Sequence, residues 1–380
     1  MTALPGRRRR STLIASLAAG AAVVTAAGLA ILGGVTLYHS TEGADAASGI
    51  PELVFPSTPT AAVAAVDESG ALASVAVLVV QPSGAGGSIV TVPVSADSSN
   101  GKGAERLPIA ETVALSGPDA LESELESMLG LGIDVLEVVD ADRLTALLEG
   151  VGPIEVEDAT LDAGAAAEIL TARDPSVPAI EEYPAATAVW SGIAAAMSER
   201  GSGSIATASA GGLTVDALMA ALSGGSVGAR GLRAEPLDAE RNPRGVDVSL
   251  LDQAEITLVF AQIAPGKVAA PNPALTLRIE VPFSDEQLEG TDFDNNNEVA
   301  YAAISSLLFV GANVISVNTD EGTTGEETIV ELADETLTPA TVGVDLLFGS
   351  LDVQVAETRI VGVDAVLRLG TDYLELMSDE

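Results

Sequence analysis

The chain has 380 residues, no cysteine and a formal net charge of −38, from 55 acidic and 17 basic residues. Disulfides are excluded, so buried apolar surface has to stabilise the fold. His39 is the only histidine, which excludes Ser-His-Asp, Cys-His and His/Cys zinc chemistry from the rest of the chain. The negative charge repels nucleic acid, so we expect no nucleic-acid partner.

A basic cluster precedes a long apolar segment at the N-terminus. Arg7, Arg8, Arg9 and Arg10 are followed by residues 13–38, which contain no Asp, Glu, Lys or Arg. As a helix this segment extends about 39 Å at 1.5 Å per residue, more than the roughly 30 Å of a hydrocarbon core. Arginines resist translocation. The pattern predicts a single-pass protein of the cell membrane, with its N-terminus inside and its C-terminal part extracytoplasmic.

A cleaved signal peptide is the alternative, because the segment Ala44-Asp45-Ala46 has the small-x-small form of a cleavage site. The apolar segment is longer than the 7–15 residues of a secretory apolar region. We therefore expect a retained anchor, with cleavage near Ala46 left open. A lipid-anchored precursor is excluded, since there is no cysteine to acylate.

An Ala-, Ser-, Thr- and Pro-rich tether is expected next, followed by alternating strands and helices. Near-continuous β-branched runs predict strands buried on both faces. The expected strands are 73–80, 88–94, 134–139 and 153–156, and the expected helices are 118–131, 141–148, 163–172, 187–197 and 215–222. This alternation predicts a three-layer α/β sandwich.

The rest of the chain predicts a linker and a second, smaller α/β domain. Residues 223–274 are rich in glycine and show no regular helical or strand periodicity, apart from one expected strand at 255–261. Beyond them a β-α-β-β-α-β order is expected, with helices at 297–308 and 339–348. The expected divisions are a cytoplasmic basic segment 1–11, a transmembrane helix 12–40, a tether 41–66, a first α/β domain 67–222, an irregular extension 223–274 and a C-terminal domain 275–376.

Several short blocks occur in an order that resembles a known family. They are VAVLVV at 75–80, IVTVP at 89–93, Gly117-Pro118, LGLGID at 129–134, residues 138–140, LLEGVGP at 147–153, residues 161–173, and VDAVLRLGTDY at 363–373. The first domain resembles the LytR-CpsA-Psr family of bacterial envelope proteins. The second resembles the LytR C-terminal domain that follows it in actinobacteria.

This resemblance implies an activity whose residues are largely replaced here. Active members transfer glycopolymers from a polyprenyl-pyrophosphate carrier to peptidoglycan, using arginines and aspartates that hold the pyrophosphate and a divalent cation. Where the family has Pro-Arg-Asp this chain has Pro93-Val94-Ser95, and Ser74 stands where the family has an aspartate. The family's later arginine stretch corresponds to residues 181–190, which contain no cation.

Only a few charged residues remain near matching places. Arg106, Arg173 and Lys102 are candidate phosphate-binding residues, and Asp97 is a candidate substitute for the missing acid. Arg173 is also explained as a cation near a helix end, and Lys102 and Arg106 as solvated loop charges.

We therefore expect a non-catalytic envelope protein that acts by binding in wall-polymer assembly or its regulation, with cell-wall precursors or envelope assembly proteins as partners and no cofactor. One alternative is a phosphotransferase that uses Mg²⁺ and takes its arginines from elsewhere, such as Arg230 or Arg233. Another is an unrelated extracytoplasmic structural module.

Two further motifs have competing interpretations. Residues 292–297 begin like a calcium loop but lack its glycine and its final glutamate, so Asn297 is expected to cap a helix. Trp190 is a candidate for stacking on a sugar, but beside Ile193 it is expected in the core.

Overall fold

A computed structural model describes residues 51–98, 106–200 and 213–378, and Glu52–Glu380 form one compact unit. The expected anchor with Arg7, Arg8, Arg9 and Arg10, the cleavage site near Ala46, and Lys102 lie outside the described residues. Within the described ranges, no helix combines the length and hydropathy that crossing a membrane requires.

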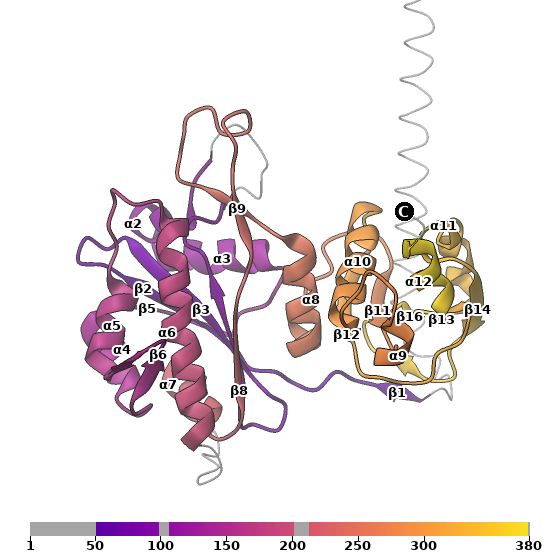
Figure 1. Cartoon of the computed structure of the whole chain (residues 1–380), viewed down its shortest axis with the longest axis horizontal. Helices are drawn as coiled ribbons and strands as arrows, with labels where there is room; N and C mark the ends of the chain where they lie inside the picture. The colour runs from indigo at the N-terminus through magenta and orange to yellow at the C-terminus, as the bar shows by residue number, and fades with distance from the viewer. Residues whose placement is uncertain (1–50, 99–105, 201–212, 379–380) are drawn as a thin grey trace, which may run out of the picture. The chain divides into compact units, whose positions relative to one another are not determined.

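The first domain is built on a mixed five-stranded sheet of order β5-β2-β3-β4-β8 (Figure 1). Its strands are β2 Thr60–Val66, β3 Leu72–Val80, β4 Gly87–Val92, β5 Val135–Val139 and β8 Val227–Gly231. Strand β3 runs antiparallel to β2 and β4, whereas β5 and β8 pair in parallel with β2 and β4. The side chains of β2 and β3 are nearly all buried, because both faces of the sheet are covered.

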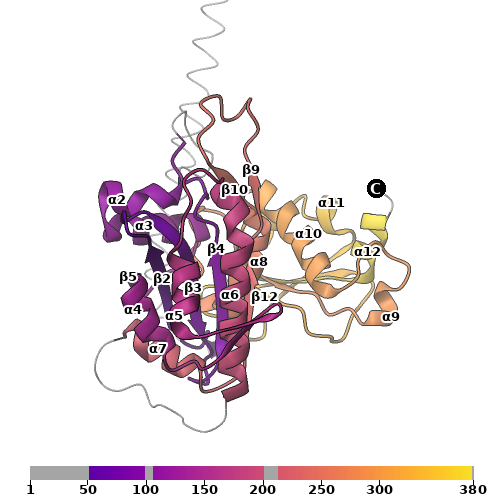
Figure 2. The same cartoon turned by 60° about the vertical axis from the view of Figure 1, so that its left-hand side comes forward.

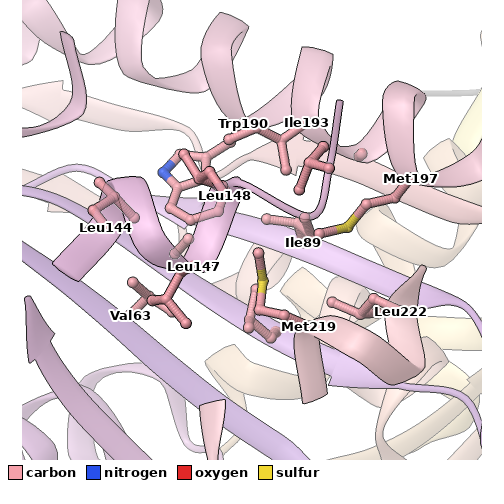
Figure 3. Packing of buried hydrophobic residues seen from close by; sticks show 14 of the residues in the cluster. Val63, Ile89, Leu144, Leu147, Leu148, Trp190, Ile193, Met197, Met219 and Leu222 are labelled. Atoms are coloured by element: carbon pink, nitrogen blue, oxygen red, sulfur yellow. The ribbon is translucent and has the colours of Figure 1, made fainter. Parts of the chain in front are cut away.

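Four helices cover one face of this sheet, as Figures 1 and 2 show. They are α4 Ala141–Leu148, α5 Ala163–Thr171, α6 Ala179–Arg200 and α7 Val215–Leu222. Trp190 of α6 packs in this core with Leu144, Leu148 and Ile193 (Figure 3), so the prediction of a core tryptophan is confirmed.

The opposite face packs against a second core, which completes the expected three layers. This core takes residues from the 3₁₀ turn η2 Ile109–Glu111, the helix α3 Pro118–Leu129 and the helix α8 Gln253–Ile263, and the short helix α2 Thr112–Ser116 lies between η2 and α3. Two small hairpins flank the layers: β6 Ile154–Val156 with β7 Ala159–Leu161, and β9 Ala234–Pro236 with β10 Ser249–Leu251.

The C-terminal domain has its own five-stranded sheet, of order β12-β11-β16-β13-β14. Its strands are β11 Thr276–Glu280, β12 Asn313–Asn318, β13 Thr328–Leu332, β14 Leu351–Val355 and β16 Ala365–Arg368. Its helices are α9 Asp285–Leu288, α10 Asn296–Phe309, α11 Asp345–Phe348 and α12 Thr371–Ser378, and the short 3₁₀ turn η3 Pro265–Lys267 precedes the sheet. The short strand β1 Glu52–Leu53 pairs in parallel with β15 Arg359–Ile360.

Two expectations about chain organisation are wrong. The tether does not extend to residue 66, because Thr60–Val66 forms the strand β2 inside the sheet, where its alanines leave room for helices on both faces. The segment 255–261 is not a strand: it lies within α8, which Asp252 caps by accepting hydrogen bonds from the Ala254 and Glu255 amides. A short apolar run does not by itself distinguish a buried strand from a buried helix.

Two local expectations in the C-terminal domain also need correction. Asn297 does not cap α10: the side chain of Asn295 does so, accepting from the amides of Asn297 and Glu298. The expected helix 339–348 is interrupted, with the 3₁₀ turn η4 Glu335–Thr341 separated from α11 by Gly343 at φ +87°. A positive φ cannot continue a right-handed helix.

The helix α8 contributes side chains to the cores of both domains. Ile256, Val259 and Phe260 pack against the first sheet, whereas Leu258 belongs to the core of the C-terminal domain. A helix that is buried nearly all round couples the surfaces it covers. We therefore expect the two domains to share part of their folding free energy.

Leu258→Ala tests this coupling. The substitution should cost about 2–5 kcal/mol through the cavity it leaves, and it should lower the urea midpoint seen by fluorescence of Trp190, the single tryptophan, in the other domain. Gln253→Ala, at an exposed position of the same helix, is the control. An unchanged Trp190 transition in Leu258→Ala would show that the domains unfold independently.

An ion pair joins the start of β5 to η3. The Asp134 carboxylate accepts from the Lys267 ammonium and from the amide and hydroxyl of Thr60. Burial acts to raise the pKa of Asp134, but the hydrogen bonds and the Lys267 charge outweigh it and hold this pKa below its usual value.

A lowered pKa makes the contribution of Asp134 depend on pH. The stabilisation is fully present above the unfolded-state pKa of about 3.9, and it is lost as the pH falls through the lower folded-state pKa. Urea unfolding of Asp134→Asn should therefore show its largest deficit near pH 7 and a shrinking deficit below about pH 4. Lys267→Met should reproduce the deficit at pH 7. A deficit independent of pH would contradict the assignment.

Candidate functional site

The positions where the resemblance places a pyrophosphate site are buried among apolar side chains. Ser74 donates its hydroxyl to the Leu170 carbonyl oxygen at 2.9 Å. Val94, at the place of the family's arginine, lies in the second core. The Ser95 hydroxyl lies 2.7 Å from that of Ser249, and both residues are buried. None of these three side chains brings a charge to the end of the sheet.

Asp97 and Arg106 form a buried ion pair just after β4. Nη1 of Arg106 donates to Oδ2 of Asp97 at 2.8 Å, and the Asp97 side chain has no exposed surface. The Asp97 amide also donates to the Ser249 carbonyl oxygen at 2.9 Å, which fixes the backbone after β4 against β10. Arg106 is therefore not a solvated loop charge. It neutralises the Asp97 carboxylate, which would be costly to bury without a cation.

Arg173 lies two residues beyond the end of α5 and is held by a different part of the fold. Its Nη1 donates to the Leu72 carbonyl oxygen at 3.3 Å. Burial acts to raise the pKa of Asp67, but hydrogen bonds from Ser69 and Ala71, with a contribution from the Arg173 charge, lower it. Arg173 and Arg106 thus contact separate groups at the start of β3 and beyond the end of β4.

The alternative arginines, Arg230 and Arg233, converge on a single acid. Glu255 of α8 is 3% exposed and forms ion pairs with Nη2 of Arg230 and Nε of Arg233, both at 3.3 Å. It also accepts from the Arg233 amide at 2.6 Å. The Arg233 guanidinium lies 5.3 Å from the centre of the Tyr301 ring, and Tyr301 donates to Asp252 at 2.7 Å. Both cations are engaged in neutralising a buried carboxylate.

Neutral hydroxyl groups join α6 to β4 in the segment 181–190, which corresponds to the later arginine stretch of the LytR-CpsA-Psr family. The Tyr183 hydroxyl donates to the Thr91 carbonyl oxygen at 2.8 Å, and the Thr91 and Thr187 hydroxyls are 3.0 Å apart. Burial raises the pKa of Tyr183 against the opposing effect of hydrogen bonds with the Thr91 and Thr187 side chains, so its phenol is neutral at physiological pH. The remaining cavity here, lined by Ser74, Val92 and Tyr183 among others, measures about 10 Å³, too small for a ligand.

The segment 292–297 makes helix-capping contacts. Besides the cap at Asn295, the Asp294 amide donates to Glu298 at 2.9 Å. Within the described residues, no group of three or more His, Cys, Asp or Glu side chains is arranged to hold a metal ion.

Sequence reasoning missed the role of Glu255 and the hydroxyl cluster of Tyr183. A signal for Glu255 was present, because a lone acid opens an otherwise apolar run at 255–261 and a buried acid needs partners. No comparable signal marked Tyr183, whose partners are distant in sequence.

No protein-family model matches this chain, and no significant match is found among curated proteins. About half of the chain matches solved structures of LytR-CpsA-Psr proteins. TagT of B. subtilis is 14% identical over 53% of this chain and 87% of its own, with a TM-score of 0.39. TagV of B. subtilis is 13% identical over 53% and 94%, with a TM-score of 0.39. TagT bound to LIIa-WTA is 14% identical over 53% and 88%, with a TM-score of 0.38. These values are too low to transfer a site or an activity.

Removing Arg106 should be costly because it takes away a cation that neutralises a buried carboxylate. We expect Arg106→Ala to lower the free energy of unfolding by about 3 kcal/mol, and the double variant Asp97→Asn/Arg106→Gln to recover much of that loss. The control is Arg241→Ala, which breaks the exposed pair with Asp238 and should cost less than about 1 kcal/mol. Equal losses for the two single variants in urea unfolding would contradict a buried ion pair.

Proposed function

We propose that this protein is a non-catalytic, LytR-CpsA-Psr-like factor that acts by binding in cell-wall polymer assembly or its regulation. The observation that carries the proposal is the burial of Ser74, Val94 and Ser95 at the places of the family's charged site residues. A phosphoryl-transfer site needs fixed cations around the developing negative charge. The chain has packing and hydroxyl contacts at these places instead.

The distribution of the other charges supports the same proposal. Arg106 is paired with buried Asp97, and Arg230 and Arg233 are paired with buried Glu255. Each of these arginines is already paired with a buried carboxylate, so a pyrophosphate would have to compete with that carboxylate for it. The phosphotransferase alternative, which depends on such arginines and on Mg²⁺, is therefore the less supported one.

The proposal includes attachment to the membrane. The arginine cluster Arg7–Arg10 and the apolar segment 13–38 would hold the described domains on the extracytoplasmic side. Lipid-linked precursors of wall polymers are the partners that such a position and the LytR-CpsA-Psr resemblance suggest. Envelope assembly proteins are the second class of partner.

The test compares a prenyl pyrophosphate with the matching alcohol. Purified full-length protein in lipid nanodiscs should bind geranylgeranyl pyrophosphate with Mg²⁺ no more than about twofold more tightly than geranylgeraniol. Arg173→Gln should leave that ratio unchanged, because Arg173 contacts a backbone carbonyl. A preference of tenfold or more for the pyrophosphate, lost in Arg173→Gln, would support the phosphotransferase alternative and overturn the proposal.

A second measurement addresses the binding role. Deleting the gene should lower the amount of glycopolymer attached to peptidoglycan, and the Arg173→Gln variant should restore it as fully as the unaltered protein. An unchanged wall after deletion would favour the unrelated structural module.

A further inference from the structure

We propose that the C-terminal domain holds a binding site for an uncharged hydrocarbon chain, such as the end of a lipid acyl or isoprenoid tail. The observation is a cavity of about 320 Å³ that continues the core of this domain. The inference does not depend on the proposed function, which concerns the first domain.

The cavity lies where the expected helix 339–348 is interrupted. Its floor is the sheet, with Leu277 of β11, Val330 of β13 and Leu367 of β16. Leu307 of α10 forms one wall, and the segment from η4 to α11, residues 340–347, lies across the other side. An unbroken helix over 339–348 would present side chains to the sheet continuously. Gly343 at φ +87° ends that continuity.

The lining defines the chemistry of the ligand. Apart from Thr341, the side chains that line the cavity are aliphatic or glycine, and none is charged. The Thr341 hydroxyl already donates to the Thr338 carbonyl oxygen at 2.9 Å. A polar or charged ligand buried here would therefore lose its hydrogen bonds to water without gaining side-chain partners. A hydrocarbon makes no such hydrogen bonds, so it would lose none on entering the cavity.

The size and the rim of the cavity favour a single chain. Taking about 30 Å³ for each water-sized group, the volume holds roughly ten such groups, which suits the end of one alkyl chain and is too small for a peptide helix about 10 Å across. Val342 and Val310 line the cavity and are 85% and 56% exposed. Phe309 and Leu346, which neighbour the lining residues Val310 and Leu347 in the sequence, are more than three-quarters exposed. Exposed apolar side chains gathered at the opening of an apolar cavity mark a binding surface.

Photo-labelling of the full-length protein tests the site. The protein is placed in nanodiscs that contain a phosphatidylcholine with a diazirine at the end of one acyl chain, or is given a diazirine-bearing dodecanol as a free probe. Labelled peptides are identified by mass spectrometry. We expect saturable labelling of residues 307–312 and 340–347. Labelling by the phospholipid would identify a membrane lipid as the source of the bound hydrocarbon chain. Labelling by the alcohol alone would identify a free amphiphile as that source.

Two variants that fill the cavity give the decisive comparison. Ala312→Phe and Ala340→Phe each place an aromatic ring among the lining residues and should reduce labelling of these peptides at least fivefold. Ala195→Phe adds the same ring at an exposed position of α6 and should leave labelling unchanged. The far-UV circular dichroism spectrum and its urea transition check that each variant folds. Ala340→Phe, at an exposed position, serves if Ala312→Phe does not fold.

The proposal is overturned if neither probe labels these peptides, or if labelling is equal in the filled variants and in Ala195→Phe. It is also overturned if the peptides are protected because a second copy of the chain covers the opening. That outcome would appear as a dimer that Leu346→Ser dissociates.

Discussion

A buried carboxylate on a helix shared by two cores is the constraint that organises much of this molecule. Helix α8 supplies Phe260 to one core and Leu258 to the other, so nearly all of its surface is removed from water. Glu255 lies on this helix and cannot reach solvent. Its charge has to be neutralised locally. Arg230 of the edge strand β8 and Arg233 just after it do so, which ties the edge of the first sheet to α8.

The same constraint accounts for how this chain uses its scarce cations. With 17 basic residues against 55 acidic ones, most carboxylates have to face water, and those that do not draw arginines to them. Asp97 takes Arg106, and Glu255 takes two more. An arginine committed to a buried acid is a poor phosphate ligand, because binding a second anion would compete with the first. The anionic composition and the pairing of these arginines with buried acids are thus two aspects of one charge distribution.

The sequence allowed the layers to be predicted better than the details within them. Runs such as 73–80 are long, β-branched and bounded by turns, so strand β3 was evident. Strand β2 was not, since TAAVAAV at 60–66 follows a proline-rich stretch and alanine has little strand preference. The interior run of α8 was mistaken for a strand because all of its residues except Thr257 are buried, which obscures the helical period. Packing against two cores, which no local pattern reveals, decided its structure.

The candidate site was harder to predict, because its character depends on contacts between distant residues. The replacement of Pro-Arg-Asp by Pro93-Val94-Ser95 was readable, but the pairing of Ser95 with Ser249 and of Arg233 with Glu255 was not. The expected pyrophosphate position and the C-terminal cavity also differ in size, which composition does not show. Between β4 and α6 the first domain closes to about 10 Å³, because Tyr183 and two threonines fill the layer. Under the interrupted helix the second domain leaves about 320 Å³. Apolar faces of sheets are normally covered by close-packed side chains, so this opening over the second sheet is a feature that packing alone does not explain.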